Sequence, residues 1–280
     1  MWICPEAMRY AALCFFLSLA SISACSWAGD LHIVLPQKNS LEPEVTGRFY
    51  VQALQLALHK TAAPDERIQI THYEKEVARE RARLLVQKGT LDVVWSSSSP
   101  KREAEFATVK FNLLRGINEY RLLVIRADEQ IRFDSIKTLS DLQQFKIGTG
   151  THWSDTEIYR FNGLPLVKSY SYEPMFRMLK LKRFDYMARS LQEVQDDTER
   201  YEKLGLAIEK NLAIHYSQPI YFFLNKNNAE LAERIKQGLE IAQQDGSLDA
   251  LFFDIPNFRQ AWEMMQALDR NVIELQIPNN

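Results

Sequence analysis

The sequence predicts an α/β protein. Short apolar runs alternate with amphipathic stretches from Leu31 onward, which is the pattern of βα units around a largely parallel sheet. Between Leu31 and Trp95 this pattern gives strand, helix, strand, helix and strand within about 65 residues. No low-complexity tract and no repeat with a period of about 20 to 50 residues interrupts the chain. These observations favour a globular α/β chain over a solenoid.

The first set of elements lies between residues 31 and 95. We predict strands at 31–35, 68–70 and 91–95, and helices at 47–60 and 77–88. Leu54, Ala57 and Leu58 share one face of the first helix, and Gly89 ends the second, as a glycine commonly does at a helix C-terminus. The last strand runs into four serines at 96–99, so a polar loop is expected there.

A second, smaller set of the same units follows an extended apolar segment at 120–126. Its predicted elements are a helix at 139–142, a strand at 145–147, a turn at 148–151, a helix at 155–161, a strand at 166–170, a helix at 173–181 and a strand at 185–188. Another extended segment at 219–224 precedes a helix at 229–244. The two extended segments bracket the second set, which indicates two lobes joined by two crossing strands. We assign 29–124 and 222–280 to lobe 1, and 125–221 to lobe 2.

The first 28 residues predict a cleaved export signal. Ala11 to Ala24 is an uncharged, mostly apolar run of 14 residues preceded by Arg9, which is the arrangement of a secretory signal peptide. A membrane-spanning helix needs roughly 20 apolar residues. The small residue Ala28 suits cleavage before Gly29, whereas Ile-Ser-Ala-Cys ending at Cys25 resembles a lipobox and would make the chain a lipoprotein. Either route predicts a periplasmic protein, and a buried N-terminal helix is the alternative.

Composition excludes several partners and chemistries. The formal charge of −2, from 34 Lys and Arg against 36 Asp and Glu, gives no reason to expect nucleic acid as a partner. The three cysteines, Cys4, Cys14 and Cys25, all precede the expected cleavage site, so the mature chain has no disulfide. Its stability is expected to come from its core.

Four motifs occur in an order that resembles the family 3 extracellular solute-binding proteins, which include the polar amino-acid receptors of ABC importers. The motifs are Leu91–Val94 followed by serines and Pro100–Glu103, then Leu139–Thr151, Leu179–Asp185 and Asp245–Leu248. The resemblance covers nearly all of the chain after residue 28. It implies a periplasmic-binding-protein-like, Venus-flytrap fold that closes on a ligand between its lobes. It also implies a monomer without cofactor that delivers a small solute to an inner-membrane permease, or reports it to a membrane sensor.

The resemblance also implies ligand-binding residues. In the family, the arginine at the position of Arg102 clamps the carboxylate of the ligand, and the position of Ser97 supplies a hydroxyl group. Gly150 and Thr151 lie where the family offers backbone N–H groups and a hydroxyl group from lobe 2. The alternatives are that Arg102 is a solvated surface charge, that Ser97 is a loop serine, and that Gly148–Thr151 is an ordinary turn.

Two positions depart from the amino-acid receptors of this family. Where those receptors usually have an aspartate that pairs with the ammonium group of the ligand, this chain has Ser190, preceded by Arg189. Arg102 and Arg189 in one cleft would suit a dicarboxylate or another anionic solute, although a zwitterion remains open. The alternative is that Arg189 pairs with Glu193, one helical turn later, and contacts no ligand.

Two tryptophans flank the expected crevice. Trp95 and Trp153 could stack on a ligand, while a buried core position is the alternative for each.

The sequence carries no signature of catalysis. Its five histidines form no metal-binding motif, so we expect no metal site, and no Gly-x-Ser-x-Gly or nucleotide-binding fingerprint occurs. We therefore expect a binding protein and not an enzyme. The alternative on the same fold is a dehydratase-like enzyme in which Glu193 or Asp155 acts as base.

Overall fold

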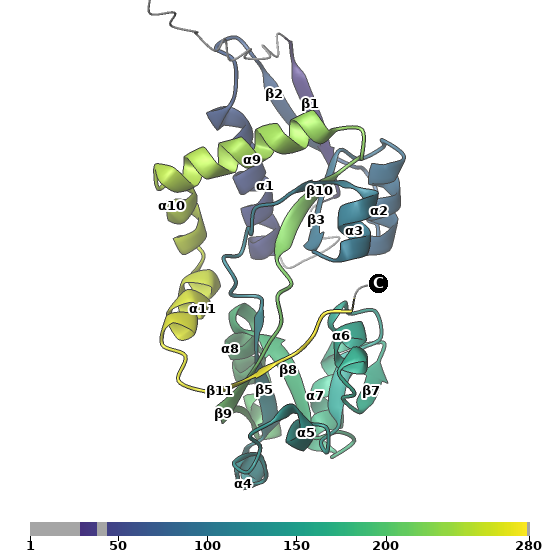
Figure 1. Ribbon diagram of the computed structural model, residues 1–280, viewed down its shortest axis with the longest axis vertical. Helices are drawn as coiled ribbons and strands as arrows, with labels where there is room; N and C mark the ends of the chain where they lie inside the picture. The colour runs from purple at the N-terminus through teal and green to yellow at the C-terminus, as the bar shows by residue number, and fades with distance from the viewer. Residues whose placement is uncertain (1–28, 38–43, 279–280) are drawn as a thin grey trace, which may run out of the picture.

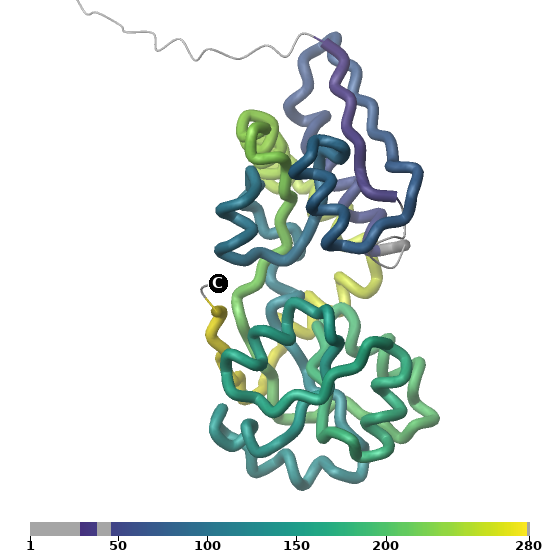
Figure 2. The backbone as a smooth tube through the Cα atoms, turned by 90° about the vertical axis from the view of Figure 1, so that its right-hand side faces the viewer, coloured from purple at the N-terminus to yellow at the C-terminus, as the bar shows by residue number. Residues whose placement is uncertain are grey.

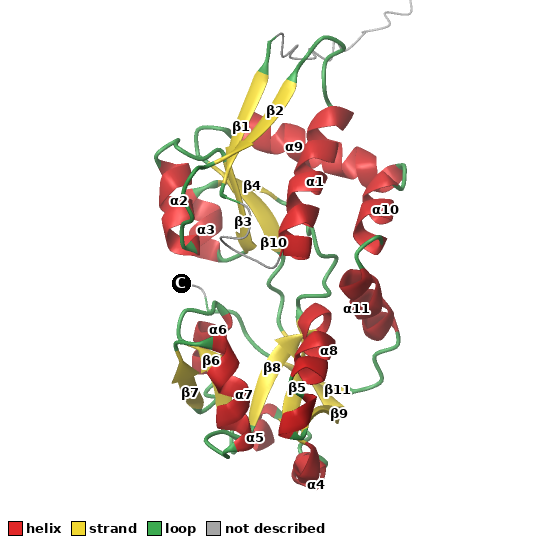
Figure 3. Ribbon diagram, turned by 180° about the vertical axis from the view of Figure 1, so that it is seen from behind, coloured by secondary structure: helices red, strands yellow, loops and turns green. Residues whose placement is uncertain are grey.

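The computed structural model describes residues 29–37 and 44–278 and has two lobes, as Figure 1 shows. The expected signal peptide at 1–28, including Cys25, lies outside the described residues. Lobe 1 has two small sheets and lobe 2 has one, each with helices packed against it, so the predicted α/β class and two-lobed architecture are confirmed. Figure 3 shows β3 (Val93–Ser97) of lobe 1 and β8 (Tyr186–Ser190) of lobe 2 ending next to the region between the lobes.

Lobe 1 contains two small sheets that lie edge to edge. Its elements are β1 (Leu31–Leu35), α1 (Glu44–Lys60), β2 (Ile68–His72), α2 (Arg79–Gln87), β3 (Val93–Ser97), α3 (Pro100–Glu105), β4 (Ala107–Val109), β10 (Ile220–Leu224), α9 (Ala229–Gln244) and α10 (Ser247–Phe253). Strand β1 pairs in parallel with β2, and β10 lies antiparallel between β3 and β4. Two hydrogen bonds join the sheets, from the Asp92 N–H to the Val34 carbonyl (2.9 Å) and from the Val34 N–H to the Asp92 carboxylate (2.7 Å).

Lobe 2 contains one mixed sheet of six strands in the order β11-β9-β5-β8-β6-β7. Its elements are β5 (Tyr120–Arg126), η1 (Ala127–Glu129), α4 (Gln130–Phe133), α5 (Leu139–Leu142), β6 (Ile147–Gly150), α6 (Asp155–Phe161), β7 (Leu166–Ser169), α7 (Tyr172–Lys180), β8 (Tyr186–Ser190), α8 (Leu191–Arg200), η2 (Glu202–Leu204), β9 (Leu206–His215) and β11 (Asn271–Glu274). Strands β6, β7 and β8 are parallel, so their carboxyl ends meet at one edge.

The ten-residue strand β9 was not predicted, because Glu209, Lys210 and Asn211 interrupt its apolar pattern. The structure accommodates this interruption with a register shift in the pairing of β9 with β5. The Glu209 carboxylate is fully buried there and accepts the backbone N–H groups of Asn211 (2.8 Å) and Leu212 (2.5 Å). A buried acidic residue therefore takes the place of ladder hydrogen bonds in the middle of the strand.

The chain passes between the lobes three times, not twice as the sequence indicated. The first two passages are residues 110–119 and 216–219, and the third is α11 (Pro256–Gln266), which leads to β11. The Asn257 amide donates to Asp196 on α8 (2.6 Å), and β11 pairs in parallel with β9. The assignment of all of 222–280 to lobe 1 was therefore wrong for β11, which is a strand of the lobe 2 sheet.

Helices α1 and α9 cross closely in lobe 1 because a glycine lies at the contact. A Cβ atom on Gly238 of α9 would overlap the backbone carbonyl group of Ala57 on α1. Gly47, in the first turns of α1, has open space where a Cβ atom would lie. Both glycines lie in helices, but only Gly238 lies where a side chain would clash.

Among the described residues no helix is long and apolar enough to cross a membrane.

We predict opposite effects of alanine at these two positions. Gly238→Ala should destabilise the fold by about 1–3 kcal/mol, because the helices must move apart. Gly47→Ala should stabilise it by about 0.5–1 kcal/mol through the higher helix propensity of alanine. Urea denaturation of both variants measures the difference, and a stabilising Gly238→Ala would contradict the close helix contact.

Candidate functional site

The strand register places the ends of β3 and β8 next to the passages between the lobes. Ser97, the last residue of β3, pairs with Ile220, which directly follows the passage at 216–219. Ser190, the last residue of β8, pairs with Arg121, which follows the passage at 110–119. Ser97 and Ser154 also meet across the lobes, where their hydroxyl groups are 3.4 Å apart. Figure 2 shows the backbone of the two lobes and the segments that pass between them. These strand ends therefore lie beside the passages, and the ligand site that the sequence predicts between them stays a prediction.

Arg102 and Ser97 lie together on the lobe 1 side. The Arg102 side chain donates from Nη1 to the Ser97 carbonyl and to the Ser97 hydroxyl (3.4 Å). Ser99 caps helix α3 by accepting the Arg102 backbone N–H (3.3 Å), which orients the helix at the end of β3. Ser97 is the final strand residue and not a loop residue, because the ladder with β10 extends through it.

No carboxylate forms an ion pair with Arg102 among the described residues. The neighbouring Glu103 instead pairs with Lys110 (2.9 Å) and accepts the Ser98 hydroxyl (2.5 Å). Burial, followed by the positive charge of Arg83, lowers the pKa of Arg102 to about 10. The guanidinium group stays charged at neutral pH, and Glu80 and Glu105 act on this charge without forming an ion pair with it among the described residues.

Arg189 behaves differently on the lobe 2 side. Its side chain is 9% exposed and forms ion pairs with Asp197 (Nε to Oδ2, 2.5 Å) and Glu193 (Nη2 to Oε2, 3.3 Å). The guanidinium carbon lies 5.0 Å from the ring centre of Trp153 and 5.1 Å from that of Tyr172. The sequence left open whether Arg189 faces a ligand or pairs with Glu193, and the structure shows the pair with Glu193. Because two carboxylates neutralise Arg189, it adds no unpaired positive charge to the cleft.

Ser190 and Glu193 form a small acidic site at the start of α8. The Ser190 hydroxyl donates to Glu193 Oε2 (2.5 Å), and the Glu193 side chain is 47% exposed. Desolvation acts to raise the pKa of Glu193, but Arg189, Ser190 and Arg121 together hold it below its ordinary value. Glu193 therefore presents an ionised carboxylate three residues beyond the position where the sequence indicated a missing acid. The sequence signal for Glu193 was its position one helical turn after Arg189.

Gly150 is the last residue of β6 and Thr151 follows it, whereas the sequence predicted a turn at 148–151, and the donors of Thr151 are already engaged. The Thr151 N–H and hydroxyl both donate to the Ser169 carbonyl, at 2.8 and 3.1 Å. The Trp153 indole covers Gly150 so closely that a Cβ atom there would overlap it. In this conformation the hydroxyl expected to face the ligand closes the β6–β7 edge instead.

The two tryptophans have different environments. Trp95 is buried in the core of lobe 1 and stacks on Tyr50, with ring centres 5.2 Å apart. Trp95 lies in the middle of β3, and it packs in the same hydrophobic cluster as residues of the neighbouring strands and helices. Trp153 is partly buried at the lobe 2 edge, next to Ser154 and against Arg189.

A second buried ion pair, Arg121 with Asp155, was not predicted. Arg121 Nε lies 3.2 Å from Asp155 Oδ2, and its guanidinium group lies 4.9 Å from the Tyr216 ring centre. Desolvation acts to raise the pKa of Asp155, but Arg121 and the hydroxyl of Tyr216 keep it below its ordinary value. Asp155 is thus a counter-ion for Arg121, and the pair fixes the start of α6 against β5.

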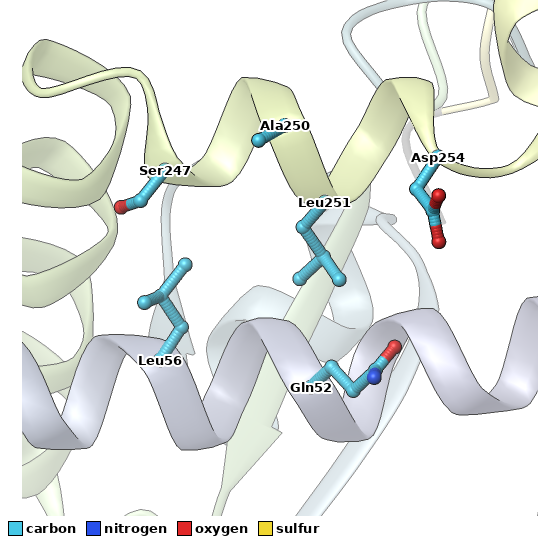
Figure 4. A pocket seen from close by; sticks show the side chains of 6 residues that line it. All are labelled: Gln52, Leu56, Ser247, Ala250, Leu251 and Asp254. Atoms are coloured by element: carbon cyan, nitrogen blue, oxygen red, sulfur yellow. The ribbon is translucent and has the colours of Figure 1, made fainter.

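A surface hollow of lobe 1 lies elsewhere, between α1 and α10. Figure 4 shows Gln52 and Leu56 of α1 facing Leu251 and Asp254 of α10 across it. It includes none of the strand ends described above.

Among the described residues no cluster of His, Cys, Asp and Glu could hold a metal ion.

Solved structures with the same arrangement are amino-acid-binding proteins. An ancestral arginine-binding protein bound to arginine superposes with a TM-score of 0.57 at 18% identity, covering 80% of this chain and 97% of that one. The probable amino-acid ABC transporter extracellular-binding protein of Bacillus subtilis gives a TM-score of 0.58 at 16% identity, covering 81% and 97%. The chain has the periplasmic-binding-protein fold. No family model and no curated sequence relative matches it.

A third structure with this binding-protein fold is an ancestral amino acid-binding protein that is a precursor of cyclohexadienyl dehydratase. It gives a TM-score of 0.52 at 13% identity and covers 81% of this chain and 94% of that one. The binding-protein fold by itself is thus compatible with binding and with catalysis, and the residues of the cleft must decide between them.

Within the binding-protein fold, the arginines on the two sides of the cleft differ in their partners. Arg83 and Glu80 act on the charge of Arg102 without forming an ion pair with it among the described residues. Arg189 instead forms ion pairs with both Glu193 and Asp197.

We predict that the two arginines nearest the passages differ in their contribution to stability. Arg121→Ala leaves Asp155 buried without its partner and should cost about 3–5 kcal/mol. Arg102→Ala breaks no ion pair among the described residues and should cost less than about 1 kcal/mol. Thermal unfolding without ligand measures both, and equal losses would show that Arg102 has a structural role.

Proposed function

We propose that this protein is a periplasmic solute-binding protein that captures a small amino-acid-like zwitterion between its lobes for an ABC importer, without converting it. One observation carries the proposal: Arg102, which has no carboxylate partner among the described residues, lies on one lobe, while the half-exposed carboxylate of Glu193 lies on the other. Export rests on the sequence of residues 1–28, and the importer on the proteins that share the fold.

The carboxylate of the ligand would bind on lobe 1. Arg102 offers the planar, two-pronged donor that suits a carboxylate, and its other contacts to Ser97 use only Nη1. Its lowered pKa reflects a charge that burial and Arg83 both disfavour, so a bound anion would stabilise it. The Ser97 hydroxyl, next to this guanidinium group, would add a second donor.

The ammonium group of the ligand would bind on lobe 2. Glu193 and Ser190 present oxygen atoms there, and Glu193 is the acid that replaces the missing aspartate one helical turn later. Since Asp197 and Glu193 neutralise Arg189, its charge no longer argues against an ammonium group. A zwitterion therefore fits better than the dicarboxylate that two free arginines would have favoured.

Asp155 and Glu193, the two candidate bases, are poorly suited to act as a general base. A base works best when its pKa lies near the working pH. Neighbouring positive charges instead keep the pKa values of both Asp155 and Glu193 below those of ordinary carboxylic acids. These acids are arranged to remain ionised, which suits recognition of a cation and supports binding without turnover.

A thermal-shift panel of amino acids and dicarboxylates tests the proposal. We expect a zwitterion to raise the Tm of the wild type, and Arg102→Ala and Glu193→Gln each to weaken its binding about 30-fold or more, as loss of a desolvated charge pair does. Lys101→Ala, an exposed neighbour, is the control and should bind normally. Equal stabilisation of Arg102→Ala would remove Arg102 from the site, and mass spectrometry of the recovered ligand would reveal any turnover.

We further predict a defined pH dependence of this binding. Because the folded-state pKa of Glu193 is lowered, its carboxylate stays charged as the pH falls from 8 to about 5, and affinity for an ammonium group should stay constant there. Affinity should fall only below the ordinary pKa of glutamate, where Glu193 begins to take up a proton. Calorimetric titrations from pH 8 to pH 4 measure this profile. A loss of affinity centred near pH 6.5 would implicate a histidine instead.

A further inference from the structure

Arg189 occupies a pocket whose walls have the chemistry of a cation-binding site. The parallel strands β6, β7 and β8 end at one edge, and the segments that follow them bring Trp153, Tyr172 and the helix α8 together. The rings of Trp153 and Tyr172 lie 6.3 Å apart, and the guanidinium group contacts both. Asp197 and Glu193 complete the enclosure with two carboxylates. Aromatic faces and carboxylates are the groups that bind guanidinium and alkylammonium ions in proteins.

The walls of this pocket are themselves held in place around the charge. The Tyr172 hydroxyl donates to Asp197 Oδ1, while Arg189 Nη2 lies 3.4 Å from the same hydroxyl. Tyr172 also packs edge-on against Phe176, with ring centres 5.3 Å apart. These contacts do not depend on the stem of Arg189. The pocket should therefore keep its shape when the arginine side chain is shortened.

The pocket adjoins the space between the lobes. Ser154, which follows Trp153 directly, makes the hydroxyl contact with Ser97 of lobe 1. Glu193, which forms one wall, is half exposed at the same edge. A cation that entered from the cleft would therefore meet the position that Arg189 fills.

We propose that Arg189 is a specificity residue, whose guanidinium group fills a cation pocket in lobe 2 and thereby excludes solutes with a long cationic side chain. This inference rests on the proposed binding of an amino-acid-like solute in the same cleft. The native protein should accept small or uncharged side chains. Removal of the Arg189 side chain should open the pocket to a free guanidinium group.

The test uses Arg189→Ala with two probes, guanidinium chloride at millimolar concentration and L-arginine, each against equal NaCl as the ionic control. Both probes should raise the Tm of Arg189→Ala, by roughly 3–6 °C at ten times the Kd. Guanidinium fits the emptied pocket alone, whereas L-arginine fits only if the pocket opens to the cleft. Neither probe should shift the wild type.

Arg234→Ala is the matched control. Arg234 is also buried and makes a two-pronged ion pair with Glu66 (2.7 Å for each contact), but it lies in lobe 1 on α9. A hole there has no opening to the cleft, so guanidinium can restore stability but L-arginine should not. If Arg189→Ala does not fold, Arg189→Ala/Asp197→Asn removes the uncompensated carboxylate and keeps Glu193 and both rings for the same measurement.

Two results would overturn the proposal. The first is that L-arginine stabilises the wild type as much as it stabilises Arg189→Ala. The second is that guanidinium stabilises Arg189→Ala but L-arginine does not, which would make Arg189 purely structural. Failure of the proposed function looks different. In that case no zwitterion stabilises the wild type, while guanidinium and L-arginine still bind the emptied pocket of Arg189→Ala.

Discussion

The ion pair between Arg189 and Asp197 determines how lobe 2 faces the cleft. Removing two such charges from water costs several kcal/mol for each ion, and only good geometry offsets this cost. Here the offset comes from a 2.5 Å contact, from two aromatic rings and from the Tyr172 hydroxyl. Because these partners come from α7, α8 and the segment after β6, the pair ties three parts of the lobe together. These three parts meet at the cleft edge, where Glu193 keeps a half-exposed carboxylate.

On the lobe 1 side of the cleft, the arginine is not neutralised by an ion pair among the described residues. Arg102 is held by serine oxygens that orient it without neutralising it. One lobe thus satisfies its arginine internally, while the other keeps its arginine available. In the proposed function, a zwitterion between Arg102 and Glu193 would give each of these two groups a partner of opposite charge.

The pattern of apolar residues predicted most of the lobe architecture, because buried strands and amphipathic helices have clear periodicities. The family resemblance grouped Arg102 with Ser97, and in the structure Ser97 ends β3 and accepts a hydrogen bond from the Arg102 side chain. The choice between core and cleft for Trp95 was beyond the apolar pattern, because a strand buried on both faces has no alternation that separates the two. The same holds for Thr151, whose donors are taken by a carbonyl group 18 residues away, and for Asp197, which reaches Arg189 from two turns along α8. Contacts between distant segments decide which polar groups remain available.

The path of β11 also limited the prediction, since four residues with little apolar pattern carry no signal of the sheet they join. Yet this path gives the molecule a useful property. Asp30 precedes the first strand of lobe 1, while Ile277 packs on the core of lobe 2. Asp30 and Ile277 therefore belong to different lobes, and a hinge motion between the lobes would change the distance between these two residues. A donor and an acceptor fluorophore attached there would convert lobe closure directly into a change of energy transfer, with no label near the cleft.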